Sequence, residues 1–171
     1  MAVNGDKTAR AARRGLLAAA MLSVFAVMAN AGRVPEPQAH SLSLERDCNG
    51  CAEGSRLQLS RDGTARISRL GKARFGGQDR HSDALLSRSE FDALIERLRQ
   101  LGLAGLASRY QEEPDQQDGR WLLLRIEWAG APATEIFCRG EAPAALLPLL
   151  AAIEAQQQRL GFAPDGRAIE H

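Results

Sequence analysis

The chain has 171 residues, of which 44% are apolar and 25% charged, with 22 basic and 21 acidic side chains. This length fits one domain with a short appendage, and this apolar fraction argues against a collagen-like or wholly disordered chain. Without residues 1–31 the chain carries 18 basic and 20 acidic residues, a net charge of −2. Because nucleic-acid-binding proteins carry a basic excess, the sequence predicts no nucleic-acid partner.

Residues 1–31 have the three parts of a secretory signal peptide. Residues 1–14 are polar and net positive, Gly15–Met28 carries no charge, and Ala29-Asn30-Ala31 supplies the small residues of a cleavage site. We expect cleavage after Ala31 and a periplasmic or secreted protein. In the alternative, residues 15–31 stay uncleaved and anchor the protein, since about 17 residues are the lower limit for a spanning helix. A membrane is a partner only in that case.

The remaining chain is expected to form one domain between two short flanking segments. Residues 32–41 contain Pro35 and Pro37 and little apolar content, which predicts an extended linker. The folded domain is expected over residues 42–160, followed by a tail, residues 161–171. About 120 residues bury roughly two thirds of their unfolded surface, which is enough for a hydrophobic core.

Alternation of apolar and polar residues predicts five strands. The Asp62-Gly63 pair between the second and third strands is a strong hairpin signal. Residues 71–84 are rich in glycine and charge and are expected to form a loop. A further turn is expected at Ala129–Ala131, between the last two strands. The predicted strands cover residues 41–45, 56–60, 64–68, 121–128 and 134–139.

Two helices are predicted from apolar residues at helical spacing. Ser87 and Glu90 form a capping box that begins the first helix, and Gly102 is placed to end it. Pro143 or Pro148 marks the first turn of the second helix, where the missing N–H costs nothing. The apolar stripes are Phe91, Leu94, Ile95, Leu98 and Leu101 on the first helix and Leu146, Leu149, Leu150, Ile153 and Leu160 on the second.

The order of elements predicts the fold class. Three strands, a helix, two strands and a helix follow one another, and each strand has one apolar and one largely polar face. This pattern favours an α+β domain, with an antiparallel sheet of about five strands and both helices packed on one face.

Several of these features resemble a family of exported bacterial domains that is catalogued as a domain of unknown function. The resemblance covers residues 42–160 and rests on Cys48-x-Gly50, the Asp62-Gly63 hairpin, Phe91-x-x-Leu94, Tyr110 and the proline-led final helix. The family pattern opens with C-x-G-x-C-P-x-Y. In this chain Cys51 comes one position early, Glu53 stands at the proline position and Ser55 at the aromatic one. The resemblance implies the fold and export and leaves the function open.

Three cysteines remain after residue 31, and export places them where disulfides persist. Cys48 and Cys51 are the ends of a predicted turn around Asn49-Gly50, and turn ends lie within the Cα separation of a disulfide. We therefore expect a Cys48–Cys51 disulfide and a buried thiol at Cys138. A redox-active C-x-x-C pair owes its low thiol pKa to a helix N-terminus, whereas the residues after Cys51 alternate like a strand.

The sequence contains no recognised catalytic or nucleotide-binding motif. We assign no catalytic residue, cofactor or metal ligand, because the three histidines do not stand at zinc-site spacing from the cysteines. The predicted function is a non-catalytic module that binds a protein or another component of the cell envelope. The alternative is a thiol-disulfide oxidoreductase that uses Cys48 and Cys51.

An interaction surface is predicted on the sheet face away from the helices. A turn at Ala129–Ala131 pairs Leu123 with Phe137 and Trp121 with Arg139. Trp121, Leu123 and Phe137 then form an apolar cluster on an otherwise polar face, which is typical of a binding site. In the alternative, Phe75, Phe162 or Ile169 from the loop or the tail covers this cluster.

Overall fold

A computed structural model describes residues 36–111 and 119–162 of the chain. These residues belong almost wholly to one compact unit that begins at Pro37. The predicted signal peptide, residues 1–31, lies outside the described residues, as does most of the predicted tail.

The unit contains seven strands and two α-helices within the described residues. The strands are β1 (Ala39–Cys48), β2 (Glu53–Ser60), β3 (Thr64–Gly71), β4 (Arg80–Leu85), β5 (Arg109–Gln111), β6 (Arg120–Trp128) and β7 (Ala131–Arg139). The α-helices are α2 (Arg88–Gln100) and α3 (Leu147–Arg159), and two short 3-10 turns are η1 (Ala73–Phe75) and η2 (Leu103–Gly105).

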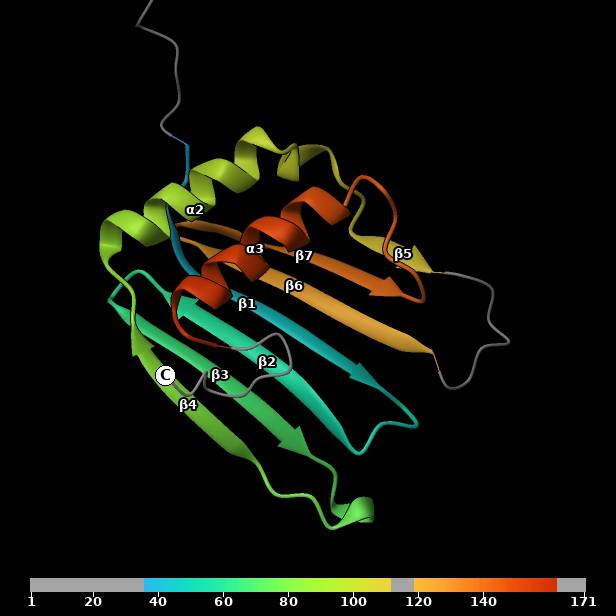
Figure 1. The fold of residues 1–171 in the computed structure, drawn as a ribbon. Helices are drawn as coiled ribbons and strands as arrows, with labels where there is room; N and C mark the ends of the chain where they lie inside the picture. The colour runs from blue at the N-terminus through green and yellow to red at the C-terminus, as the bar shows by residue number, and fades with distance from the viewer. Residues whose placement is uncertain (1–35, 112–118, 163–171) are drawn as a thin grey trace, which may run out of the picture. The chain divides into compact units, whose positions relative to one another are not determined.

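All seven strands form a single sheet in the order β4-β3-β2-β1-β6-β7-β5. Neighbouring strands are antiparallel except β5, which pairs parallel to β7. Both helices of the described residues lie over the same face of the sheet, so neither α2 nor α3 covers the opposite face (Figure 1). We call this uncovered side the outer face.

The α+β class agrees with the structure, but the prediction of a five-stranded antiparallel sheet is wrong, because the sheet has seven strands and is mixed. Residues 71–84, expected as a loop, include most of β4. This edge strand buries no side chain fully, and only Ala84 packs against the core, so it lacks the apolar alternation of a core strand. β5 has three residues, too few for any period, and its parallel pairing with β7 depends on tertiary contact.

The core lies between the helices and the sheet face that they cover. Alternate residues of the strands point into it, among them Leu42, Leu57, Ile67, Leu124 and Ile136, each at most 2% exposed. Burying one such side chain fully contributes about 1.5–3 kcal/mol. The first strand begins at Ala39, which is itself 3% exposed, so the core starts three residues before Leu42.

The ends of both helices follow local sequence signals. The Ser87 hydroxyl accepts from the Glu90 N–H at 3.2 Å, and the Glu90 carboxylate accepts from the Ser87 N–H at 2.9 Å, which confirms the capping box. Gly102 follows α2 with φ of 90°, a left-handed conformation that favours glycine. In α3, Pro148 rather than Pro143 lies in the first turn.

Candidate functional site

The outer face carries the apolar cluster that the sequence predicts. Successive side chains of a strand point to opposite faces, so the burial of Leu122 and Leu124 places Trp121 and Leu123 on the outer face. The register pairs Leu123 with Phe137 and Trp121 with Arg139, which confirms the predicted pairing. The turn is one residue shorter than expected, because Trp128 pairs with Ala131 after a register shift.

Trp121, Leu123 and Phe137, which we call the aromatic cluster, are half-buried. The ring centroids of Trp121 and Phe137 are 6.2 Å apart, and their planes are inclined by 29°. The Arg109 guanidinium of β5 lies 5.4 Å from the centroid of the Phe137 ring, a cation–π contact. The aromatic cluster therefore lies on β6 and β7, and the contact with Arg109 connects it to β5.

A hollow of about 340 Å³ opens at the aromatic cluster. Its wall is completed by Asn49 of the β1–β2 turn and by Arg139 of β7. Of the side chains predicted to cover the cluster, Phe75 lies on η1 and is 52% exposed, and Phe162 belongs to the core at 2% exposed. Ile169 lies outside the described residues. We call the hollow at the aromatic cluster the aromatic hollow.

A second hollow, of about 420 Å³, lies over the middle strands of the outer face. We call it the polar hollow, because hydroxyl, amide and charged side chains dominate its lining. The polar residues that alternate with leucine in β1 and β2 are its signal in the sequence, but this alternation alone did not predict a hollow. The side chains that line it include Ser41, Ser43, Gln58, Ser60, Thr64 and Arg125.

Ion pairs across the strands balance much of the charge on the outer face. The guanidinium of Arg66 lies 2.6 Å from the Asp83 carboxylate, and that of Arg56 lies 2.6 Å from Glu45. Arg125 contacts Glu135 of β7 at 2.9 Å, as the predicted register requires, and its other carboxylate partner lies on its own strand. Hydrogen bonds from Arg66 lower the pKa of Asp83 below its ordinary value, because they stabilise the charged carboxylate.

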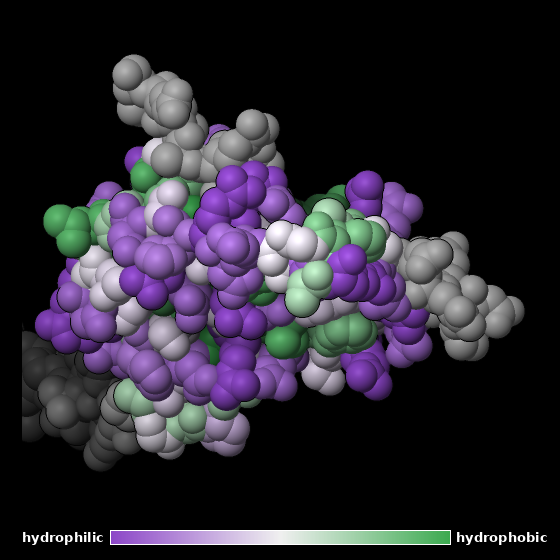
Figure 2. Space-filling model, turned by 90° about the horizontal axis from the view of Figure 1, so that it is seen from below, coloured by the Kyte–Doolittle hydropathy of each residue, from purple (hydrophilic) through white to green (hydrophobic). Residues whose placement is uncertain are grey.

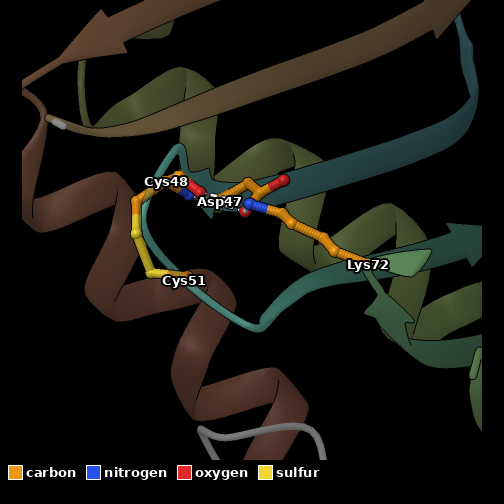
Figure 3. The surroundings of a disulfide bond; sticks show 4 residues. All are labelled: Asp47, Cys48, Cys51 and Lys72. Carbon is orange, nitrogen blue, oxygen red and sulfur yellow. Dashed lines mark hydrogen bonds and ion pairs between the residues drawn. A yellow bond between two sulfur atoms is a disulfide. The ribbon is translucent and has the colours of Figure 1, made fainter. Parts of the chain in front are cut away.

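Cys48 and Cys51 form a disulfide across the β1–β2 turn, with their Cα atoms 5.3 Å apart (Figure 3). The Cys48 N–H donates to the Asp47 carboxylate at 2.6 Å. The Lys72 ammonium lies 2.6 Å from the same carboxylate and also donates to the Cys48 carbonyl oxygen. Neither cysteine belongs to a helix, so the pair lacks the helix N-terminus that is typical of a redox-active C-x-x-C motif.

A third hollow, of about 420 Å³, lies beside this turn, with Cys51 in its wall. The charged residues in its lining largely satisfy one another or nearby groups. Arg69 pairs with Glu53 at 2.5 Å, and Arg46 pairs with Glu154 of α3 at 2.6 Å. The pair between Arg46 and Glu154 connects this end of the sheet to α3.

The third cysteine lies apart from the pair. Cys138 of β7 is fully buried, and its Sγ atom donates to the Glu141 carbonyl oxygen at 3.6 Å. Within residues 36–111 and 119–162, no three histidine, cysteine or acidic side chains are grouped as a metal site requires.

Comparison with known proteins gives no assignment, because no family model matches the chain and no curated protein matches it. The resemblance to a family of exported domains therefore stays a prediction. Among the described residues, no helix has both the length and the hydropathy that crossing a bilayer requires.

Proposed function

We propose that this protein is a non-catalytic binding module of the cell envelope and that it contacts its partner through the aromatic cluster on the outer face. The observation that carries the proposal is the position of Trp121 and Phe137. Both rings are partly exposed beside a hollow, on a sheet face that neither α2 nor α3 covers. Tryptophan and arginine are enriched among the residues whose truncation costs the most binding energy, and Trp121 and Arg139 both line this hollow.

Charged residues lie beside the aromatic cluster, because the register pairs Trp121 with Asp47 and Arg139 and pairs Leu123 with Glu45. Figure 2 views the molecule from below and shows mostly hydrophilic side chains, with hydrophobic ones in small separate groups. Contiguous apolar residues rimmed by polar ones can mark an interaction site, whereas scattered single apolar residues are ordinary surface.

The proposed location in the envelope rests on residues 1–31, which have the composition of a signal peptide. Mass spectrometry of the exported protein tests this part. We expect a mature N-terminus at Gly32. An intact terminus at Met1 or Ala2 in the membrane fraction contradicts cleavage and supports the anchored alternative.

Photo-crosslinking in the producing cells tests the binding function. A photoreactive phenylalanine analogue at Leu123 lies within the aromatic cluster, and the same analogue at Leu85 is the matched control, because Leu85 is 90% exposed at the other edge of the sheet. We expect a discrete crosslinked product from position 123 alone. This product should disappear when Trp121→Ser and Phe137→Ser are combined.

Two outcomes contradict the proposal. One is the same product from position 85, and the other is a product from position 123 that survives the two serine substitutions. Circular dichroism and thermal unfolding of the substituted protein establish that the fold is retained.

The alternative function, a thiol-disulfide oxidoreductase, has less support. Cys51 is half-exposed beside a hollow, but Cys48 is only 7% exposed. A reduction potential below roughly −300 mV supports a structural disulfide, and one above roughly −230 mV supports the enzyme.

A further inference from the structure

On the basis of the proposed function, we propose that the bound envelope component is an uncharged glycan chain. This chain lies across the outer face from the aromatic hollow to the polar hollow. The two hollows adjoin along β6. Leu123 lines the aromatic hollow and Arg125 lines the polar hollow, and both side chains point to the same face two residues apart, a separation of about 7 Å.

The polar hollow offers hydrogen-bonding groups that suit sugar hydroxyls. A serine hydroxyl and a glutamine amide each donate and accept, and so does each hydroxyl of a sugar. Within the described part of the chain, the side chains of Ser41, Ser43 and Gln58 make no hydrogen bond, so they are available to a ligand. A ligand rich in hydroxyls can donate hydrogen bonds to such groups and accept hydrogen bonds from them.

The charges around the polar hollow favour an uncharged ligand. Arg66 is paired with Asp83, and Arg125 is paired with Glu127 and Glu135, so neither arginine adds a free positive charge. A site for a phosphate or an acidic polymer needs an excess of unpaired cations. Paired guanidinium and carboxylate groups can still bond to hydroxyls, because each keeps further donors or lone pairs.

The aromatic cluster supplies the apolar part of such a site. One face of a sugar ring consists mainly of C–H groups, and these pack favourably against the electron-rich faces of aromatic rings. Trp121 and Phe137 present partly exposed rings at one end of the outer face. From Trp121 to Glu127 the strand extends about 20 Å, which accommodates an oligosaccharide better than a single sugar.

A protein partner fits this face less well. Specific protein interfaces have an apolar centre that excludes water from the surrounding contacts. Here the apolar cluster has three members and lies at one end, whereas the middle of the face is polar. Binding of a protein instead of a glycan is therefore an outcome that the experiments below distinguish.

Isothermal titration calorimetry on the mature protein tests the inference with maltohexaose, cellohexaose, N-acetylchitohexaose and, as an anionic counterpart, dextran sulfate. We expect at least one of the three uncharged hexasaccharides to bind. Its Kd should change less than about twofold between 0.05 and 0.5 M NaCl, because salt screens only charge interactions. Dextran sulfate should bind more weakly than this hexasaccharide.

Two substitutions and one control locate the bound sugar. Trp121→Ala should weaken binding about tenfold, and Gln58→Ala, at an exposed position of the polar hollow, should weaken it about threefold to tenfold. Phe75→Ala is the matched aromatic control, since Phe75 is exposed on η1, between β3 and β4, and should leave the Kd unchanged.

The inference is overturned if none of the three hexasaccharides binds, if dextran sulfate binds more tightly, or if Gln58→Ala has no effect. The crosslinking experiment separates this failure from failure of the proposed function. If a protein is captured at Leu123 and none of the sugars binds, the glycan proposal is refuted and the proposed binding function stands. If crosslinking gives no product and no sugar binds, both the glycan proposal and the proposed binding function are refuted.

Discussion

Reduction of the Cys48–Cys51 disulfide should lower the free energy of unfolding by about 2 kcal/mol. The two cysteines are three positions apart, so the bond closes a loop of four residues. The chain-entropy relation for such a loop gives a loss of about 6 cal/mol/K in the unfolded state, or about 2 kcal/mol at 25 °C. A longer loop would give a larger effect.

The folded turn should survive reduction, because other contacts hold it. The Cys51 N–H donates to the Cys48 carbonyl oxygen at 3.4 Å, and the Lys72 N–H donates to the Ala52 carbonyl oxygen at 3.1 Å. The ion pair between Lys72 and Asp47 adds a contact between β1 and the end of β3 (Figure 3). The free energy of unfolding is therefore expected to fall by about the 2 kcal/mol that loop closure alone gives.

Urea unfolding with and without a phosphine reductant measures this loss. For a slope of about 2 kcal/mol per molar urea, the midpoint should fall by about 1 M with an unchanged slope. The double variant Cys48→Ala/Cys51→Ala should behave similarly and should not respond to the reductant, since Cys138 is a buried thiol. A loss above about 4 kcal/mol, or below about 0.5 kcal/mol, refutes the reasoning from loop length.

Three further predictions concern α2 and its contacts. Ser87→Ala removes the hydroxyl of the capping box and should cost about 1 kcal/mol in urea unfolding; an unchanged midpoint contradicts this. Phe91→Ala, at a side chain with no exposed area, should cost about 3–5 kcal/mol, and a cost below about 1 kcal/mol means that the core collapses into the space. Hydrogen bonds from Arg61 lower the pKa of Asp92 in the folded state. These hydrogen bonds therefore stabilise the folded protein above the unfolded pKa of about 3.9, and this stabilisation is lost as the pH falls through the folded pKa. The difference in melting temperature between the wild type and Asp92→Asn should therefore be constant from about pH 5 to 8 and shrink below about pH 4; a difference that grows on acidification contradicts the assignment.

The parts of the fold that the sequence predicted depend on residues close together in the chain. The capping box at Ser87 and the glycine that ends α2 act within one turn of the helix. The pairing of Leu123 with Phe137 follows from a short turn and from the period of two, which together fix the faces of a hairpin. The same locality makes the cysteine pair predictable, because its two residues flank an Asn-Gly turn.

The features that the sequence could not predict depend on segments distant in the chain. β4 is polar, and pairing with β3 makes it a strand, whereas β5 becomes a strand only where β7 lies beside it. The contact of Lys72 with Asp47 likewise joins residues 25 positions apart. No periodic pattern marks such contacts, because their stabilisation comes from backbone and side-chain partners that only the folded chain brings near.

The sequence by itself determined which residues of the last hairpin share a face, because the alternation of side chains along a strand is a property of the backbone. Tertiary structure decided which residues of the other strands lie beside them on that face. The order of strands places the hydroxyl-rich sides of β1 and β2 next to β6, which brings Ser43 beside Arg125 and places the polar hollow on the same face as the aromatic hollow. That juxtaposition arises from pairing between strands about 80 residues apart, and such pairing is fixed only when the helices bury the other face of the sheet.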